Sequence, residues 1–317
     1  EPEAPAPRGP RRAFHRPGRR LFLGRRGREG PSRCRNAAGR APSPPGRGFD
    51  RLAYLADCFD LIEINSTFYR PPFPSVAAGW ARRVSSRPAF RFTLKLYRGF
   101  THEAAEVPAA ALRSWTEGVA PLRAAGRLGA VLAQFPYSFH CTEENRGRVA
   151  RLKDLLPADP LVLEARHRSW GTPAAGLFLQ GLRIGFCNID QPPVSYSLLP
   201  SALATSPVGY VRLHGRNAAD WFRKDALRDE RYDYLYSPEE LQEWTGRSRT
   251  VAASASEVYV VANNHFRGQA VCNACELRSR LEGGKVRVPA PLLAAYPRLR
   301  PIAAPEEDRG RPFRLVS

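Results

Sequence analysis

The sequence predicts an α/β fold, a single (β/α)8 barrel of the TIM type, from three observations. Eight short apolar runs recur along the 317 residues, and segments with helix signals separate them. Continuous apolar runs that alternate with helices indicate parallel strands buried on both faces. Eight such units within about 270 residues match the size of this barrel. An open, doubly wound sheet is the alternative that the same pattern allows.

The predicted strands are runs of mostly apolar residues. In chain order they are residues 21–24, 59–65, 90–96, 128–135, 160–166, 183–190, 208–214 and 257–264. The first run, LFLG, is the only apolar interruption of an arginine-, proline- and glycine-rich region, and it is assigned as the first strand of the barrel.

Three of the segments between the strands carry explicit helix signals. Apolar residues recur at i, i+3 and i+7 within residues 149–156, which is the spacing of one helix face. Thr172 followed by Pro173 offers an N-cap and a proline at the first helical position. Ser237 and Glu240 have the spacing of a capping box. These signals predict helices after the fourth, fifth and seventh strands.

The composition divides the chain into three parts. Residues 1–48 contain 13 Arg, nine Pro and eight Gly, which predicts a disordered, low-complexity basic region that also holds the first strand. Residues 49–300 are assigned to the barrel domain. Residues 301–317, rich in proline and charge, are expected to form a loose tail.

Composition and charge exclude several classes of protein. With 43% hydrophobic and 25% charged residues, the chain is not wholly disordered. The longest apolar run, near residues 129–135, is far shorter than the roughly 20 residues of a membrane helix, so no membrane partner is expected. The first residues lack the apolar core of a secretory signal. The six cysteines therefore indicate reduced thiols in an intracellular, cytoplasmic protein.

Polar residues gather where the predicted strands end. The carboxyl ends of the strands meet at one mouth of a (β/α)8 barrel, where catalytic groups of this fold lie. The candidate catalytic residues are Glu63, Glu164, His214 and His265, and the candidate substrate-binding residues are Asn65, Lys95, Arg166, Arg212, Asn263 and Asn264.

Strand alternation refines this assignment. Residues two apart share one face of a strand, which pairs Glu63 with Asn65, Glu164 with Arg166, and Arg212 with His214. A charged side chain inside a buried strand is costly unless it is paired. We therefore expect an ionic network of Glu63, Lys95, Glu164 and Arg212. The alternative is that this network only fills the barrel interior.

Seven motifs carry a resemblance to a known family. In chain order they are FDLIEINSTFYRPP, LKLYRGFTH, LAQFPYSF, LEARHRSW, YVRLHGRN, RYDYLYSPEEL and NNHFRGQAVCNA. Together they resemble the YecE-like family, domain of unknown function 72, over about residues 49–282. The resemblance implies a TIM-type barrel and leaves the reaction open. The loop after LFLG departs from the family, since it has no Trp and many Arg.

Three chemistries fit the residues at the mouth. A divalent metal such as Zn, Mn or Fe is the first, with the mixed shell Glu63, His102, Glu164, Asp190, His214 and His265. Metal-free acid–base chemistry is the second, with the two glutamates as carboxylates and His214 or His265 as the proton shuttle. Phosphate recognition is the third, through the basic residues Lys95, Arg166, Arg212 and Arg216.

Two further features bear on function. The net charge of +19 would attract phosphate polyanions. Residues 216–236 also carry aromatic and basic residues, but their acidic and basic residues are equal in number. A lid over the mouth explains this segment at least as well as nucleic-acid binding does. Cys272 and Cys275 form a single C-x-x-C, and incidental thiols are expected there.

The sequence therefore predicts an enzyme, a hydrolase or an isomerase, that acts at the barrel mouth. Its substrate is expected to be phosphorylated, sugar-like or a nucleic-acid phosphodiester. The alternative is a non-catalytic nucleic-acid-binding protein in which the basic N-terminal region binds and the barrel is a scaffold.

Overall fold

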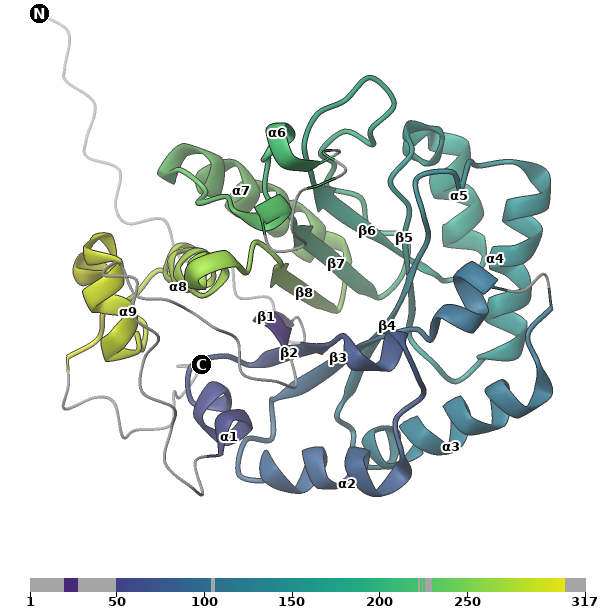
Figure 1. Ribbon diagram of the computed structural model, residues 1–317, viewed down its shortest axis with the longest axis horizontal. Helices are drawn as coiled ribbons and strands as arrows, with labels where there is room; N and C mark the ends of the chain where they lie inside the picture. The colour runs from purple at the N-terminus through teal and green to yellow at the C-terminus, as the bar shows by residue number, and fades with distance from the viewer. Residues whose placement is uncertain are drawn as a thin grey trace, which may run out of the picture.

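Eight parallel strands close into a barrel in chain order (Figure 1). They are β1 (Arg20–Gly27), β2 (Leu61–Ile64), β3 (Arg91–Lys95), β4 (Leu128–Gln134), β5 (Leu161–Glu164), β6 (Gly185–Asp190), β7 (Val208–Leu213) and β8 (Glu257–Ala262). The computed structural model describes residues 20–27, 50–103, 106–221, 223, 225 and 230–305. Each predicted run overlaps one of these strands, and β1 extends beyond the run 21–24 at both ends, so the predicted fold is confirmed.

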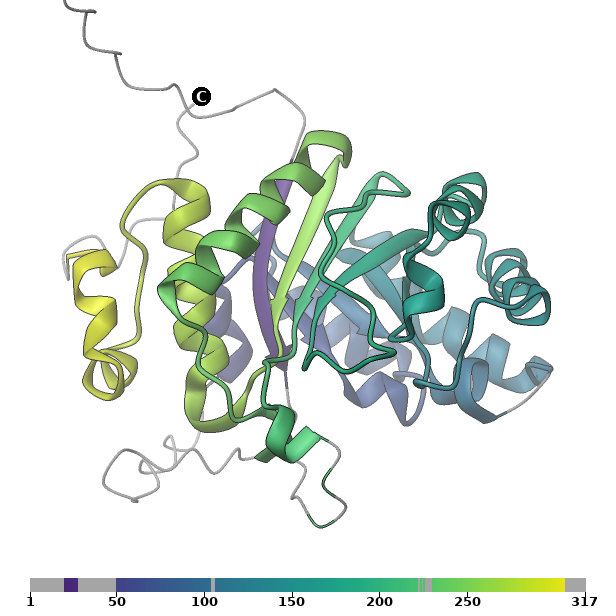
Figure 2. The same cartoon turned by 90° about the horizontal axis from the view of Figure 1, so that it is seen from above.

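The first strand closes the barrel. β1 pairs in parallel with β2 on one side and with β8 on the other, which excludes the open sheet. Figure 2 shows β1, in purple, directly beside β8. The other residues of the region 1–48, for which disorder is predicted, lie outside the described residues.

Helices surround the barrel (Figures 1 and 2). They are α1 (Arg51–Ala56), α2 (Pro74–Arg83), α3 (Ala109–Ala124), α4 (Glu143–Leu155), α5 (Pro173–Gly181), α6 (Ala218–Trp221), α7 (Pro238–Ser254), α8 (Gln269–Glu282) and α9 (Ala290–Ala295). The connection from β6 to β7, residues 191–207, contains no helix. This one connection departs from a regular alternation of strand and helix.

The predicted helix starts are confirmed by their caps. The Thr172 hydroxyl accepts a hydrogen bond from the Ala175 amide at 3.2 Å, and Pro173 begins α5. At α7 both halves of the capping box are present, since the Ser237 hydroxyl accepts from the Glu240 amide at 3.2 Å and the Glu240 carboxylate accepts from the Ser237 amide at 2.9 Å. Such a cap stabilises a helix by about 0.5–2 kcal/mol.

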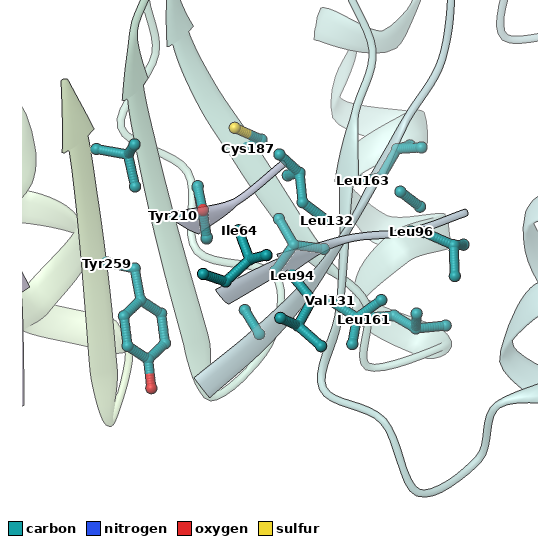
Figure 3. Close-up of a cluster of buried hydrophobic side chains, with 14 of the residues drawn as sticks. Ile64, Leu94, Leu96, Val131, Leu132, Leu161, Leu163, Cys187, Tyr210 and Tyr259 are labelled. Carbon is teal, nitrogen blue, oxygen red and sulfur yellow. The ribbon is translucent and has the colours of Figure 1, made fainter. Parts of the chain in front are cut away.

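Buried hydrophobic side chains of the strands form the core around which the site is built. Figure 3 shows Ile64, Leu94, Leu132, Tyr210 and Tyr259 among them, from five different strands. Full burial of one large apolar side chain contributes about 1.5–3 kcal/mol. The core therefore holds the strand ends, and the polar residues on them, in fixed positions.

The chain after α8 returns to the barrel exterior. The 3-10 turn Pro297–Ile302 packs against both α8 and α9. The Val286 amide donates to the Ile302 carbonyl oxygen, and the Ala304 amide donates to the Val286 carbonyl oxygen. The first residues of the predicted loose tail are thus ordered against residue 286, and residues 306–317 lie outside the described part.

Among the described helices, none combines the length and the apolar character needed to cross a membrane.

Candidate functional site

Arg212, on β7, lies inside the barrel between two glutamates. Its Nε and Nη2 donate to the two carboxylate oxygens of Glu63 at 3.0 and 2.7 Å, and its Nη1 donates to Glu164 Oε2 at 2.8 Å. All three side chains are at most 1% exposed. Arg212 therefore joins three of the four residues of the predicted ionic network, and with them β2, β5 and β7. The fourth residue, Lys95, contacts the Phe68 ring. Because its guanidinium is bonded to carboxylates, Arg212 does not offer the anion-binding donor that the sequence predicts.

Glu63 accepts hydrogen bonds from several side chains of the described residues. Besides Arg212, the Tyr210 hydroxyl donates at 2.9 Å and Asn65 Nδ2 at 3.2 Å. The Tyr210 hydroxyl also contacts Thr93 Oγ1 at 3.0 Å. Sequence reasoning missed Tyr210, although its position two residues before Arg212 places both on the same face of β7. Glu63 is thus a buried acceptor that fixes its neighbours.

Glu164 is held ionised by the groups around it. Gln134 donates to Oε1 at 2.5 Å, and the Arg166 guanidinium lies 3.3 Å from the same oxygen. Burial alone raises the pKa of a carboxyl group, but Arg212, His214 and Arg166 together hold the pKa of Glu164 well below its usual range. A carboxylate with so low a pKa is a weak base. It is suited to orienting Arg166 and His214 rather than to accepting a proton.

His214 follows β7 and is fully buried. Burial lowers its pKa to about 3, because desolvation of the imidazolium outweighs the attraction of the nearby Glu164 carboxylate. Nε2 lies 3.2 Å from Glu164 Oε1 without the geometry of a hydrogen bond, and Nδ1 lies 2.9 Å from the amide nitrogen of Asn263. The expectation that His214 shuttles protons near neutral pH is therefore not supported by its surroundings.

His265 and Asn264 follow β8 but occupy different places. His265 is partly buried, its Nδ1 lies 3.0 Å from the Asn263 carbonyl oxygen, and its ring packs against Tyr232 at 4.9 Å between centroids. Asn264 instead donates to the Tyr234 carbonyl oxygen at 2.7 Å and to Asn273 Oδ1, on α8, at 2.8 Å. The structure therefore brings Asn263 to the ionic network and leaves Asn264 between the barrel and α8.

Two cations lie beside aromatic rings at the ends of β3 and β5. Lys95 is 8% exposed, and its Nζ lies 4.0 Å from the centroid of the Phe68 ring. The Arg166 guanidinium lies 5.5 Å from the Trp221 ring and 5.7 Å from the Tyr137 ring. Cation–π contacts of this kind orient a positive charge while leaving it charged. Phe68 and Tyr137, which sequence reasoning did not single out, thus position the predicted anion-binding residues.

The six residues of the predicted metal shell do not gather as one set, although Glu164 and His214 lie 3.2 Å apart. Asp190 is bonded through both oxygens to Arg216 Nε at 3.0 Å, and His102 Nδ1 is bonded to Thr101 Oγ1 at 2.7 Å. Within residues 20–27, 50–103, 106–221 and 230–305, no three His, Cys, Asp or Glu side chains gather as metal ligands. The donor set of the described mouth therefore does not fit a metal centre.

The remaining motifs of the sequence are structural in this geometry. Arg216 pairs with Asp190, Glu240 and Glu243, so it too is bonded to carboxylates. Cys272 lies in the first turn of α8, and burial raises its pKa to about 12. A thiol with so high a pKa is a poor nucleophile, in agreement with incidental thiols.

The comparisons with known proteins agree with this fold. The model of the family described as a protein of unknown function, DUF72, matches residues 39–296. The protein YunF of Bacillus subtilis is 27% identical over 248 residues, which cover 73% of this chain and 86% of YunF.

Solved structures of two relatives match over most of their length. A DUF72 family protein from Thermotoga maritima is 30% identical, with a TM-score of 0.69, over 82% of this chain and 99% of that protein. A DUF72 family protein from Enterococcus faecalis is 25% identical, with a TM-score of 0.71, over 83% and 95% of the two chains. With its closed barrel and the matching family model, this chain belongs to the DUF72 family.

Proposed function

We propose that the protein is an enzyme that binds a small phosphate-bearing or sugar-like substrate at the barrel mouth and acts on it by acid–base chemistry, as a hydrolase or an isomerase. Two buried polar atoms carry this proposal. Asn65 Oδ1 and His214 Nε2 have no hydrogen-bond partner within the described residues. An unsatisfied buried polar atom costs about 1–3 kcal/mol. Hydroxyl groups or oxygens of a bound substrate would satisfy both atoms.

The orientation of Asn65 follows from its neighbour. Its amide nitrogen donates to the Glu63 carboxylate and to the Glu63 carbonyl oxygen. The opposite orientation would place the amide oxygen against a carboxylate, which repels it. Oδ1 is therefore directed away from Glu63, as an acceptor for a donor such as a sugar hydroxyl.

The charge of the site supports an anionic substrate. Arg212, Arg166 and Lys95 are three cations against the two carboxylates Glu63 and Glu164, and a neutral His214 adds no charge. One positive charge remains in this group of residues. The Arg166 guanidinium donates from Nε and Nη2 to Glu164 Oε1, at 3.4 and 3.3 Å, which leaves Nη1 to donate to a phosphate oxygen. The Lys95 ammonium adds a point charge.

His265 is the proton-transfer group of the proposal. Its Nδ1 faces the Asn263 carbonyl oxygen, which only accepts hydrogen bonds, so Nδ1 carries a proton and Nε2 is the basic nitrogen. General acid–base catalysis by a positioned histidine typically contributes 10²–10⁴-fold to a rate, on the order of 3–5 kcal/mol. Hydrolysis of a phosphate ester and isomerisation of a sugar both require such a group.

The loop that follows β7, residues 216–236, favours a small substrate over nucleic acid. In its described part, Arg223 pairs with Asp220, Asp225 and Glu230. Arginines that are already paired contribute little to the binding of phosphate backbones, which depends on the release of counterions by unpaired cations. The non-catalytic nucleic-acid-binding alternative therefore depends on the N-terminal region rather than on the mouth.

The test is a turnover screen with matched variants. The protein is incubated with sugar phosphates, free sugars and short oligonucleotides, and products are followed by ³¹P NMR and mass spectrometry. We expect turnover of one sugar phosphate or sugar, with a loss of at least roughly 100-fold in His265→Gln and a raised KM in Lys95→Gln. Arg168→Gln, an exposed arginine bonded to the Ser195 carbonyl oxygen, is the control that keeps full activity. Turnover that survives His265→Gln would overturn the assignment, and processing of oligonucleotides alone would move the substrate class to phosphodiesters.

A further inference from the structure

We infer that Asn263 locks His214 in a single tautomer, with its proton on Nε2, so that His214 acts as a neutral hydrogen-bond donor in the site. Both side chains are fully buried, and Asn263 stands between Arg212 and the imidazole ring. The three side chains form a short chain of hydrogen bonds in which each member fixes the orientation of the next.

The chain begins at Arg212, which can only donate. Its Nη2 lies 3.4 Å from the Asn263 amide oxygen, while the rest of the guanidinium is fixed by Glu63 and Glu164. The amide oxygen must face the guanidinium, because the amide nitrogen would be repelled there. The Asn263 amide nitrogen therefore faces the histidine.

The chain ends at the imidazole. Asn263 Nδ2 lies 2.9 Å from His214 Nδ1, and an amide nitrogen also only donates, so Nδ1 must present its lone pair. In a neutral imidazole the proton is then on Nε2. A second contact gives the same answer, because Glu164 Oε1 lies 3.2 Å from Nε2 and favours an N–H over a lone pair.

The consequence is a donor that keeps its proton. Because the pKa of His214 is lowered to about 3 by burial, the ring stays neutral at physiological pH. Nε2 lies 3.2 Å from Glu164 Oε1 but makes no hydrogen bond within the described residues, so its N–H is available to donate to a ligand oxygen. A preorganised neutral donor stabilises negative charge that develops on such an oxygen. Asn263 is in this account a positioning residue. The donor role rests on the proposed function, whereas the tautomer does not.

The tautomer can be read directly in the whole protein. Two-bond ¹H–¹⁵N spectra of protein labelled on histidine nitrogen distinguish an Nε2–H ring, an Nδ1–H ring and an imidazolium. Six histidines contribute to the spectrum, and the resonance lost in His214→Gln assigns the one of interest. We expect the Nε2–H pattern at pH 7 and no change down to pH 5. An Nδ1–H pattern, averaging between tautomers, or an imidazolium would overturn the inference.

A variant tests whether Asn263 is the lock. Asn263→Asp places a carboxylate opposite Nδ1, and we expect the proton to move to Nδ1 or a second proton to bind. Asn264→Asp is the matched neighbour that does not touch the ring, and it should leave the Nε2–H pattern unchanged. An unchanged pattern in Asn263→Asp would refute the lock. If this variant does not fold, the wild-type spectrum still decides the tautomer.

Kinetics separate the lock from the donor role. If the turnover of the proposed function is found, Asn263→Asp should lower kcat by roughly 100-fold or more with a smaller effect on KM. A changed tautomer with unchanged kcat would refute the donor role and leave the lock in place. An absence of any turnover would contradict the proposed function alone.

Discussion

A single arginine neutralises two buried carboxylates in the middle of the barrel. Arg212 bonds to Glu63 and Glu164 from a position that is 1% exposed. The sequence predicted that these three residues belong to one ionic network, because a charged side chain inside a buried strand is costly unless it is paired. Sequence alone could not show that the guanidinium nitrogens all donate to these carboxylates. This depends on the distances between three strands that are far apart in the chain.

Loss of this arginine should destabilise the protein strongly. Arg212→Met leaves two buried carboxylates without their cation, and we expect a loss of about 3–5 kcal/mol in the free energy of unfolding. Urea denaturation followed by circular dichroism measures it. Arg166→Met is the control, because Glu164 keeps its bond to Arg212 when this partly exposed arginine is lost, and we expect a smaller loss. Equal losses in the two variants would refute the central position of Arg212.

The titration of His214 makes stability depend on pH. In the folded protein its pKa is about 3, whereas an unfolded histidine titrates near its ordinary value of 6.5. Between these values the unfolded state binds one proton more than the folded state, so stability falls as the pH is lowered from 6.5 toward 3. Protonation of Glu164 also lowers the stability as the pH falls further, because the pKa of Glu164 in the folded protein lies below its ordinary value.

Replacing the histidine should reduce this dependence. His214→Gln removes the proton difference, and the slope of unfolding free energy against pH between 4 and 6 should decrease by up to about 1.4 kcal/mol per pH unit. Urea denaturation at several pH values measures the slope. Identical slopes for the wild type and the variant would show that His214 is not held neutral by burial.

At the scale of elements, helix α3 packs very closely against the segment that follows β2. A Cβ built on Gly118 of α3 would lie 2.1 Å from the Pro72 carbonyl oxygen, which no rotamer change relieves because both atoms belong to the backbone framework. Gly118→Ala should therefore destabilise the protein by about 1–3 kcal/mol. Gly246, in α7, has no atom within 4 Å of such a Cβ, and Gly246→Ala should stabilise by up to about 1 kcal/mol. Thermal unfolding compares the two, and a stabilising Gly118→Ala would contradict this packing.

The elements could be predicted to different degrees. Apolar runs of four to eight residues located every strand, and cap residues such as Thr172 and Ser237 located helix starts, because these signals are local. The connection 191–207 has no helix, which a count of strand–helix units does not reveal. Asn263 and Asn264 are neighbours at the end of β8, so their side chains are expected on opposite faces of the strand. The alternation of side chains does not tell which of the two faces is the interior. The structure was needed to separate them.

For the whole molecule, closure depends on a strand in the least regular part of the sequence. β1 lies between β2 and β8, and its loss would expose the hydrogen-bonding edges of both neighbours. Removal of residues 1–27 should abolish cooperative unfolding and promote aggregation. Removal of residues 1–19 keeps all eight strands and is the matched control. Calorimetry and size-exclusion chromatography compare the two truncations, and equal cooperativity would show that the barrel does not need β1.

The central claim is that Lys95 and Arg166 make the barrel mouth a site for an anion. Titration of inorganic phosphate into the wild type, into Arg168→Gln and into the double variant Lys95→Gln/Arg166→Gln, followed by calorimetry at fixed ionic strength, tests it most directly. We predict one saturable site in the wild type and in Arg168→Gln, and an affinity at least tenfold weaker in the double variant. Equal affinity in all three proteins, or no saturable binding at all, would contradict the claim.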